Sequence, residues 1–154
     1  MCKLCWALLV AAIVVMLGAI VIIATGNKTS EGSDGRQVIQ LEPGQRDLVL
    51  AEMRVFVESI RDVTQALGAN DKAQFEKAAL RVGLAAQEGI PLDLMKALPL
   101  PFKKLGMETH KKFDQLADSA AQGVDNAVLL TELSQLMNNC VACHAAYQIQ
   151  PSQP

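Results

Sequence analysis

The apolar residues of this 154-residue chain change their pattern twice along the sequence. No charged residue interrupts them from Leu4 to Thr25, and a helix of that length would cross the apolar core of a bilayer. Residues 27–44 are mainly polar and glycine-rich, as in a solvated tether. From Gln45 onward, apolar residues recur every three or four positions. The sequence therefore predicts an N-terminal membrane anchor (1–26), a flexible linker (27–44) and a helical domain (45–150).

The helical domain contains four long amphipathic segments. A stripe of apolar residues runs along each segment, with most charged residues opposite it. We expect these helices to begin near Gln45, at Asn70 or Asp71 as N-cap, at Pro101 and near Asp125, with a short helical turn over 92–98. No segment shows sustained two-residue alternation, so we expect no sheet. The predicted fold is all-α: an antiparallel four-helix bundle preceded by one N-terminal transmembrane helix.

The alternative reading of the first segment is a cleavable signal peptide, because Ala24 and Gly26 are small residues at a conceivable cleavage site. The uncharged run is longer than the apolar core of a signal peptide, which spans about 7–15 residues. We therefore expect an uncleaved helix in contact with membrane lipid, with Trp6 at one interface. The flanking charges weakly favour a cytoplasmic N-terminus, with the helical domain on the opposite side of the membrane.

The most specific motif is Cys140-Val141-Ala142-Cys143-His144, near the end of the chain. C-x-x-C-H is the attachment signature of a covalent c-type haem, in which two thiols form thioethers and the histidine binds the iron. On a helix these three side chains share one face, because they are three and four residues apart. A zinc site would need further ligands, and a thioredoxin-like dithiol would follow a strand. The motif therefore predicts one covalent haem c.

The fourth segment also resembles a known family. Cys140-Val-Ala-Cys143-His144-Ala-Ala-Tyr147 on the last of four helices is similar to the class II c-type cytochromes, the cytochrome c′ family and its low-spin relatives. The resemblance covers roughly Gln45 to Gln150. It implies that Cys140 and Cys143 are the thioether residues, that His144 is the proximal iron ligand and that Tyr147 packs beside the haem edge. Gln148 stands where the family often has a basic residue.

The sixth iron ligand decides what such a haem does. By the same resemblance, the first helix presents either methionine or an apolar residue to the iron, and Met53 is the candidate on the edge of its apolar stripe. Leu50 is the apolar alternative, and Met53 could equally be an ordinary core residue. His110, on the third helix, is a less favoured ligand and is more often a hydrogen-bonded boundary residue.

Other features bear on partners. Lys103, Lys104, Lys111 and Lys112 could form a docking stripe for an acidic redox protein or a solvated helix face.

Cys2 and Cys5 precede Trp6 rather than histidine, so we assign them no haem. The slight excess of acidic residues, 16 against 14 basic, excludes no partner. A homodimer is compatible with the sequence. No phosphate-binding loop, serine nucleophile motif or nucleic-acid-binding surface is present, and we expect no enzyme activity.

The resulting hypothesis is a membrane-tethered mono-haem c-type cytochrome. It would transfer electrons between redox partner proteins on the periplasmic side of a bacterial inner membrane, as the resemblance to c-type cytochromes implies. Two alternatives stay open. One is a five-coordinate, cytochrome c′-like protein that binds or senses NO or CO, and the other is an accessory haem subunit of a membrane respiratory complex.

Overall fold

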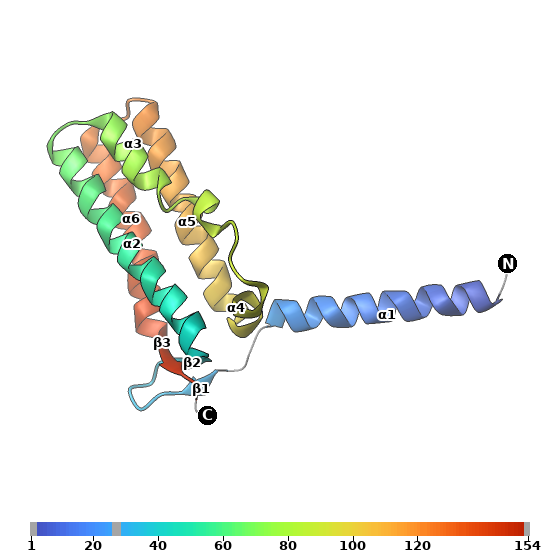
Figure 1. Cartoon of the computed structure of the whole chain (residues 1–154). Coiled ribbons are helices and arrows are strands. Elements are labelled where there is room, and N and C mark those ends of the chain that lie inside the picture. Colours follow the sequence, from blue (N-terminus) through green and yellow to red (C-terminus); the bar gives the residue numbers. More distant parts are fainter. Residues whose placement is uncertain (1–2, 26–28, 153–154) are drawn as a thin grey trace.

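The computed structural model describes residues 3–25 and 29–152. Its elements follow in the order α1 (Lys3–Thr25), β1 (Ser30–Glu31), β2 (Gln37–Leu41), α2 (Pro43–Gly68), α3 (Lys72–Leu80), the 3₁₀ turn η1 (Leu84–Gln87), α4 (Leu92–Ala97), α5 (Leu100–Ala121), α6 (Asn126–Ala146) and β3 (Tyr147–Pro151). Helices α2, α3, α5 and α6 lie side by side and form the helical body, while α1 projects away from it (Figure 1).

The main core lies between the four helices of the body. Phe75 of α3 and Phe113 of α5 are almost completely buried in it, as are Val63 of α2 and Leu129 of α6. Each of these residues belongs to the apolar stripe that the three-to-four-residue spacing predicts for its helix. Burying these stripes against one another removes their apolar surface from water, which is the main favourable contribution to folding.

Local signals in the sequence explain where the helices begin and end. Asp71 is the N-cap of α3, as predicted, and its Oδ1 accepts a hydrogen bond from the backbone N–H of Gln74 at 2.9 Å. Gly123 adopts a positive φ of 75° just after α5, where the backbone N–H of Val124 donates to the carbonyl of Ser119. This is the usual left-handed helix end, for which glycine is favoured.

A three-stranded sheet contradicts the predicted all-α fold. β2 pairs antiparallel with β1 and parallel with β3, so that Ile39 lies opposite Ile149. Val38, Ile39 and Leu41 are buried, although they lie in the segment predicted to be a flexible linker. The reason is tertiary: β2 and β3 are each five residues long, and these two paired strands are separated in sequence by all the helices of the body. The fourth helix accordingly ends at Ala146 rather than at Pro151.

The sheet packs against a second, smaller core. Ile39 and Leu41 of β2 contact Val49 of α2 together with Leu94 and Leu98 of the α4 region. Gln45 Nε2 also donates a hydrogen bond to Asp93 Oδ2 at 3.0 Å, which joins the first turn of α2 to α4. This second core packs β2, β3 and α4 together at the end of the helical body where α6 ends.

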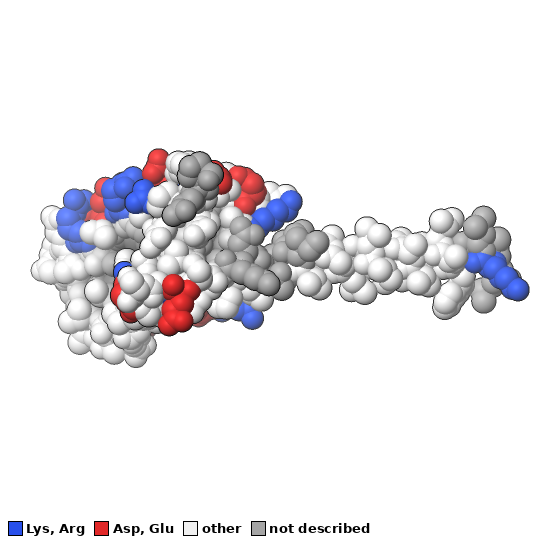
Figure 2. All heavy atoms as spheres, turned by 90° about the horizontal axis from the view of Figure 1, so that it is seen from below, with Lys and Arg blue, Asp and Glu red and all other residues white. Residues whose placement is uncertain are grey.

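The first segment forms a helix, and α1 carries no charged residue except Lys3. Figure 2 shows charged side chains of both signs on the helical body, whereas the length of α1 is uncharged. Over residues 3–25 and 29–152, however, no helix has the length and apolar character needed to span a membrane. This finding contradicts the predicted transmembrane helix and the predicted single-pass location in the inner membrane. The prediction of a transmembrane helix was based on the absence of charged residues from Leu4 to Thr25. That absence alone is not enough to define a membrane span.

Candidate functional site

The C-x-x-C-H motif occupies the last two turns of α6, directly before β3. Cys140 and Cys143 are half-buried, and His144 is exposed. Cys140 packs against the main core. The helical spacing therefore places both thiols and the imidazole on one face of α6, as the sequence predicts, with the thiols nearer the protein interior.

A polar network anchors α6 to α5 one residue before the first cysteine. Asn139 Nδ2 donates to the Thr109 hydroxyl at 3.2 Å, and Asn139 Oδ1 accepts from Lys112 Nζ at 3.0 Å. The side chain of Thr109 itself donates to the carbonyl of Leu105. These bonds fix the rotation of α6 about its axis relative to α5, and with it the direction in which the motif faces.

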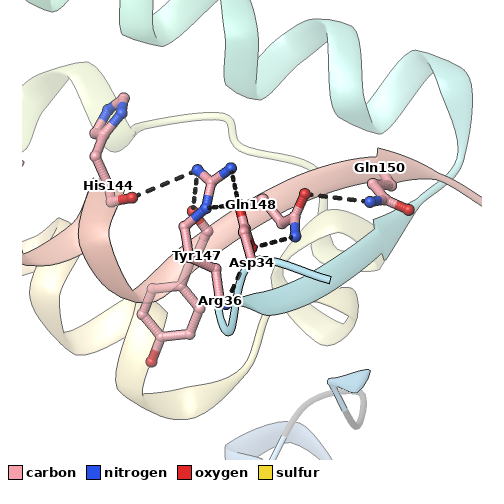
Figure 3. Close-up of polar contacts among 6 residues, drawn as sticks. All are labelled: Asp34, Arg36, His144, Tyr147, Gln148 and Gln150. Atoms are coloured by element: carbon pink, nitrogen blue, oxygen red, sulfur yellow. Dashed lines mark hydrogen bonds and ion pairs between the residues drawn. The ribbon is translucent and has the colours of Figure 1, made fainter. Parts of the chain in front are cut away.

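Arg36 caps the C-terminal end of α6 by hydrogen bonding to backbone carbonyls there. Its Nη1 donates to the backbone carbonyls of His144 and Tyr147 at 3.5 and 3.4 Å, while its Nη2 lies 2.7 Å from Asp34 Oδ2 (Figure 3). Gln148 Nε2 donates to the other oxygen of Asp34. The last carbonyls of a helix lack partners within it and carry partial negative charge, so a guanidinium is favourable there. Sequence reasoning missed this role because Asp34 and Arg36 lie in the segment that was expected to be a linker.

The same interaction affects the charge of Asp34. The hydrogen bonds from Arg36 lower the pKa of the Asp34 carboxyl below its usual value. Asp34 therefore remains a carboxylate over the neutral range and keeps Arg36 oriented toward the end of α6. In Figure 3 the imidazole of His144 points away from this pair, and only the backbone of His144 contacts Arg36.

Both thiols of the motif are free cysteines. Burial raises the pKa of Cys140 and of Cys143, and the neighbouring Cys140 raises that of Cys143 further. The two side chains are therefore neutral thiols near pH 7. Such partly buried thiols differ from the exposed, low-pKa cysteines of redox-active dithiols, whose thiolate is the reactive form.

Met53 packs against the same core from another helix, α2. It is half-buried on α2 and packs against the main core, as Cys140 does from α6. Leu50, the apolar alternative, lies half-buried one turn earlier on α2. Val57 follows Met53 by one turn on the same face and is 68% exposed. The structure thus brings Met53 and Cys140 to one cluster, whereas the iron-binding role of Met53 remains a prediction.

An uncovered apolar surface lies on the face of α6 that carries the motif. Met137 and Val141 share that face with Cys140 and His144 by helical spacing, and they are 41% and 68% exposed. These two side chains would give one face of a bound macrocycle an apolar surface to cover. A porphyrin is a flat apolar macrocycle, so two thiols, an imidazole and this apolar face fit the group that the motif implies.

His110 is placed quite differently from His144. It is 2% exposed on α5, and its ring lies 4.9 Å from that of Phe56. Its Nδ1 lies 2.8 Å from the carbonyl of Val82, and its Nε2 lies 2.7 Å from Gln87 Nε2 and 3.4 Å from Glu52 Oε1. Both ring nitrogens therefore have protein partners, which argues against His110 as an iron ligand.

The Glu52–His110 pair predicts how stability depends on pH. Burial is the largest single influence and opposes the charged form of each group. The interaction between the two groups, together with the Val82 carbonyl on His110 and Gln87 on Glu52, outweighs burial, so the pKa of His110 is raised and that of Glu52 is lowered. A raised histidine pKa stabilises the fold below the unfolded value of about 6.5, and this contribution is lost as the pH rises through the folded pKa. A lowered glutamate pKa stabilises the fold above about 4.3, and this is lost on acidification.

We therefore expect the pair's contribution to be largest between about pH 4.5 and 6.5 and to decrease as the pH rises above this window. Chemical denaturation of the unaltered chain and of Glu52→Gln across this range measures the effect. Glu52→Gln should remove most of the pH dependence above pH 6.5. An unchanged slope in the variant would contradict the assigned pair.

Tyr147 lies beyond the helix that carries the motif. It is the first residue of β3, and its ring contacts Phe102 edge-on at 5.4 Å, within the second core. The structure thus places Tyr147 with the sheet, whereas Cys140 packs against the main core. The contact of Tyr147 with the haem edge stays a prediction.

Other proposed metal or redox groups receive no support. Within the described parts of the chain, no three His, Cys, Asp or Glu side chains lie close enough to hold a metal ion together. Cys5 is an exposed free cysteine of α1, and Cys2 lies outside the described residues. A zinc site built on Cys140 and Cys143 would need further ligands of this kind.

The four lysines of the predicted basic stripe are not equivalent. Lys103 Nζ donates to the carbonyl of Met95, and Lys112 Nζ donates to Asn139. Lys103, Lys104 and Lys111 border an open, mainly apolar hollow of about 1100 Å³, whose other wall includes Ala142, Ala146 and Tyr147. Helical spacing puts Ala142 and Ala146 on the face of α6 opposite to Cys140 and His144.

Comparisons with family models, with curated protein sequences and with solved structures give no match for this chain. The functional interpretation therefore rests on the motif and on the surroundings that the fold gives it.

Proposed function

We propose that the chain is a mono-haem c-type cytochrome that carries electrons between redox partner proteins. The observation that carries this proposal is the position of Cys140, Cys143 and His144 on one face of the last turns of α6, beside exposed apolar residues. The motif is specific in sequence, and its surroundings are suitable for covering one face of a porphyrin.

Each residue of the site has a separate role in this proposal. Cys140 and Cys143 would hold the macrocycle through two thioethers, and His144 would donate an imidazole nitrogen to the iron. Met53 would donate its thioether sulfur from α2. The bound haem supplies an iron that changes between the ferric and ferrous states and so stores one electron. The side chains of Met137, Val141 and Val57 would exclude water from the face that they cover.

Rigid positioning is what an electron carrier requires from its protein. The Asn139–Thr109 bond and the Arg36–Asp34 pair hold both ends of the motif-bearing turns. Ligands held by such contacts keep their places when the charge of the iron changes, so little reorganises during transfer.

Met53→Ala separates the electron carrier from a gas-binding protein. If Met53 binds the iron, the unaltered haem protein should be low-spin in the ferric state, with a far-red sulfur-to-iron band, and should bind CO slowly or not at all. Met53→Ala should abolish that band, admit CO and lower the reduction potential, because methionine ligation favours ferrous iron. Optical spectroscopy and potentiometry measure all three effects.

Leu50→Ala is the matched control, since Leu50 is also half-buried and lies one turn away on α2. It should keep the sulfur-to-iron band. A high-spin spectrum and rapid CO binding in the unaltered protein would instead favour a gas-binding function, with Leu50, Met53 and Phe56 lining the open side of the iron. A low-spin spectrum that survives Met53→Ala and is lost in His110→Ala would assign the sixth ligand to His110.

A further inference from the structure

A second potential site lies away from the C-x-x-C-H motif. It is a half-open cavity of about 260 Å³ bordered by α2, η1, α4 and α5. Its walls are mainly apolar and include Val49, Ile90, Leu94, Leu98, Phe102 and Met107. Neither Met53 nor any residue of the motif lines it. Mainly apolar cavities with a few convergent polar groups are typical binding sites for small molecules.

Of the polar side chains that line this cavity, three contact one another: Glu52, Gln87 and His110. Gln87 Nε2 donates to Glu52 Oε1 at 2.6 Å, and both side chains contact the Nε2 edge of His110. The contact of His110 Nδ1 with the carbonyl of Val82 fixes the ring on its other side. The protein therefore holds a carboxylate and an imidazole in place in a mainly apolar wall.

The charges around the cavity indicate what kind of ligand it accepts. Glu52, Glu88 and Lys103 line it, and Lys103 Nζ donates to the carbonyl of Met95, so the cavity wall carries two carboxylates and one ammonium group. The carboxylate of Glu52 is an acceptor only, so it favours a ligand that donates a hydrogen bond and disfavours an anion. A dry cavity of about 150 Å³ is enough to hold benzene, so this one has room for a single substituted ring.

We infer that this cavity binds a small aromatic ligand bearing one hydrogen-bond donor, of the phenol class, with its ring among the apolar walls and its donor on Glu52. The inference is independent of haem binding, because the two sites share no residue. It adds a small-molecule site to a chain whose proposed function is electron transfer.

The test uses three single-ring probes with the same methyl-substituted benzene ring on the full chain: p-cresol, toluene and 4-methylbenzoate. Amide chemical shifts in NMR titrations report both affinity and location. We expect p-cresol to shift the amides of cavity residues, with a dissociation constant of about 1 mM, which is reasonable for so few atoms. Toluene lacks the donor and 4-methylbenzoate is an anion, so both should bind about tenfold more weakly or worse.

Gly106→Leu tests the location. Gly106 lines the cavity from α5, and a Cβ added there would meet no atom within 4 Å, so leucine can fill the space without a backbone clash. The variant should lose p-cresol binding. Gly68→Leu is the matched control, because Gly68 also lies on a helix with open space around its Cβ but is remote from the cavity residues. It should bind p-cresol like the unaltered chain.

Glu52→Gln tests the chemistry. It should reduce the preference for p-cresol over toluene about tenfold while leaving toluene binding unchanged. Equal binding of 4-methylbenzoate and p-cresol, or p-cresol shifts outside the cavity, would overturn the inference. So would unchanged p-cresol binding by a folded Gly106→Leu. The shifts in the unaltered chain decide the matter even if a variant fails to fold.

Discussion

His144→Ala is expected to remove the proximal ligand of the haem while leaving the fold intact. The imidazole of His144 is exposed, so its loss creates no cavity and leaves no buried group without a partner. The haem should remain attached, because both thioethers are independent of the imidazole. Its spectrum should change completely from that of the unaltered protein. Absorption spectroscopy of the two purified proteins measures this effect.

Added imidazole is expected to restore the original spectrum of His144→Ala, which a general loss of structure would not allow. His110→Ala provides the converse control, because His110 is buried and bonded on both sides. It should leave the spectrum unchanged but cost about 1–3 kcal/mol of unfolding free energy, since buried groups lose their partners. A normal haem spectrum in His144→Ala would refute the assigned ligand.

Phe113→Ala is expected to be among the most destabilising single substitutions in the helical body. Phe113 is fully buried at the centre of the main core, and its ring stacks on that of Phe56 at 5.6 Å. Truncating a buried phenylalanine costs about 3–5 kcal/mol, because the lost apolar contacts add to the cost of the cavity left behind. This is a large part of the 5–15 kcal/mol, roughly, that stabilises a typical domain.

Guanidinium denaturation followed by circular dichroism measures the change in unfolding free energy. Phe102→Ala is the matched control: Phe102 is only half-buried beside the second core, so the same truncation should cost clearly less. Equal losses at the two positions would show that the core is not centred on Phe113.

The helices could be predicted from the sequence because their signals are local. Apolar spacing along one helix, the cap at Asp71 and the turn at Gly123 each act within a few residues. The sheet could not be predicted in this way. β2 and β3 are short, and their pairing depends on the folded helices bringing Ile39 opposite Ile149. The absence of charge in the first segment, in turn, was mistaken for evidence of a membrane span.

In the candidate site, too, the features that depend on local sequence could be predicted and those that depend on tertiary contacts could not. The two cysteines and His144 could be found because their chemistry depends on a fixed spacing along one helix. The support given by Arg36 could not, because it comes from a turn more than a hundred residues away in sequence. The burial of His110 against Glu52 likewise depends on how α2 and α5 pack. Whether Met53 faces the iron is also a tertiary question, and it calls for the spectroscopic test described above.

The most direct test of the proposed haem attachment is the mass of the denatured chain after expression with a cytochrome c maturation system. We expect a mass increased by one haem, retained under denaturing conditions because Cys140 and Cys143 hold it covalently. Replacing both cysteines by serine should return the mass to that of the polypeptide alone. A denatured chain that carries no haem, in a strain that matures a control cytochrome c, would contradict the central claim.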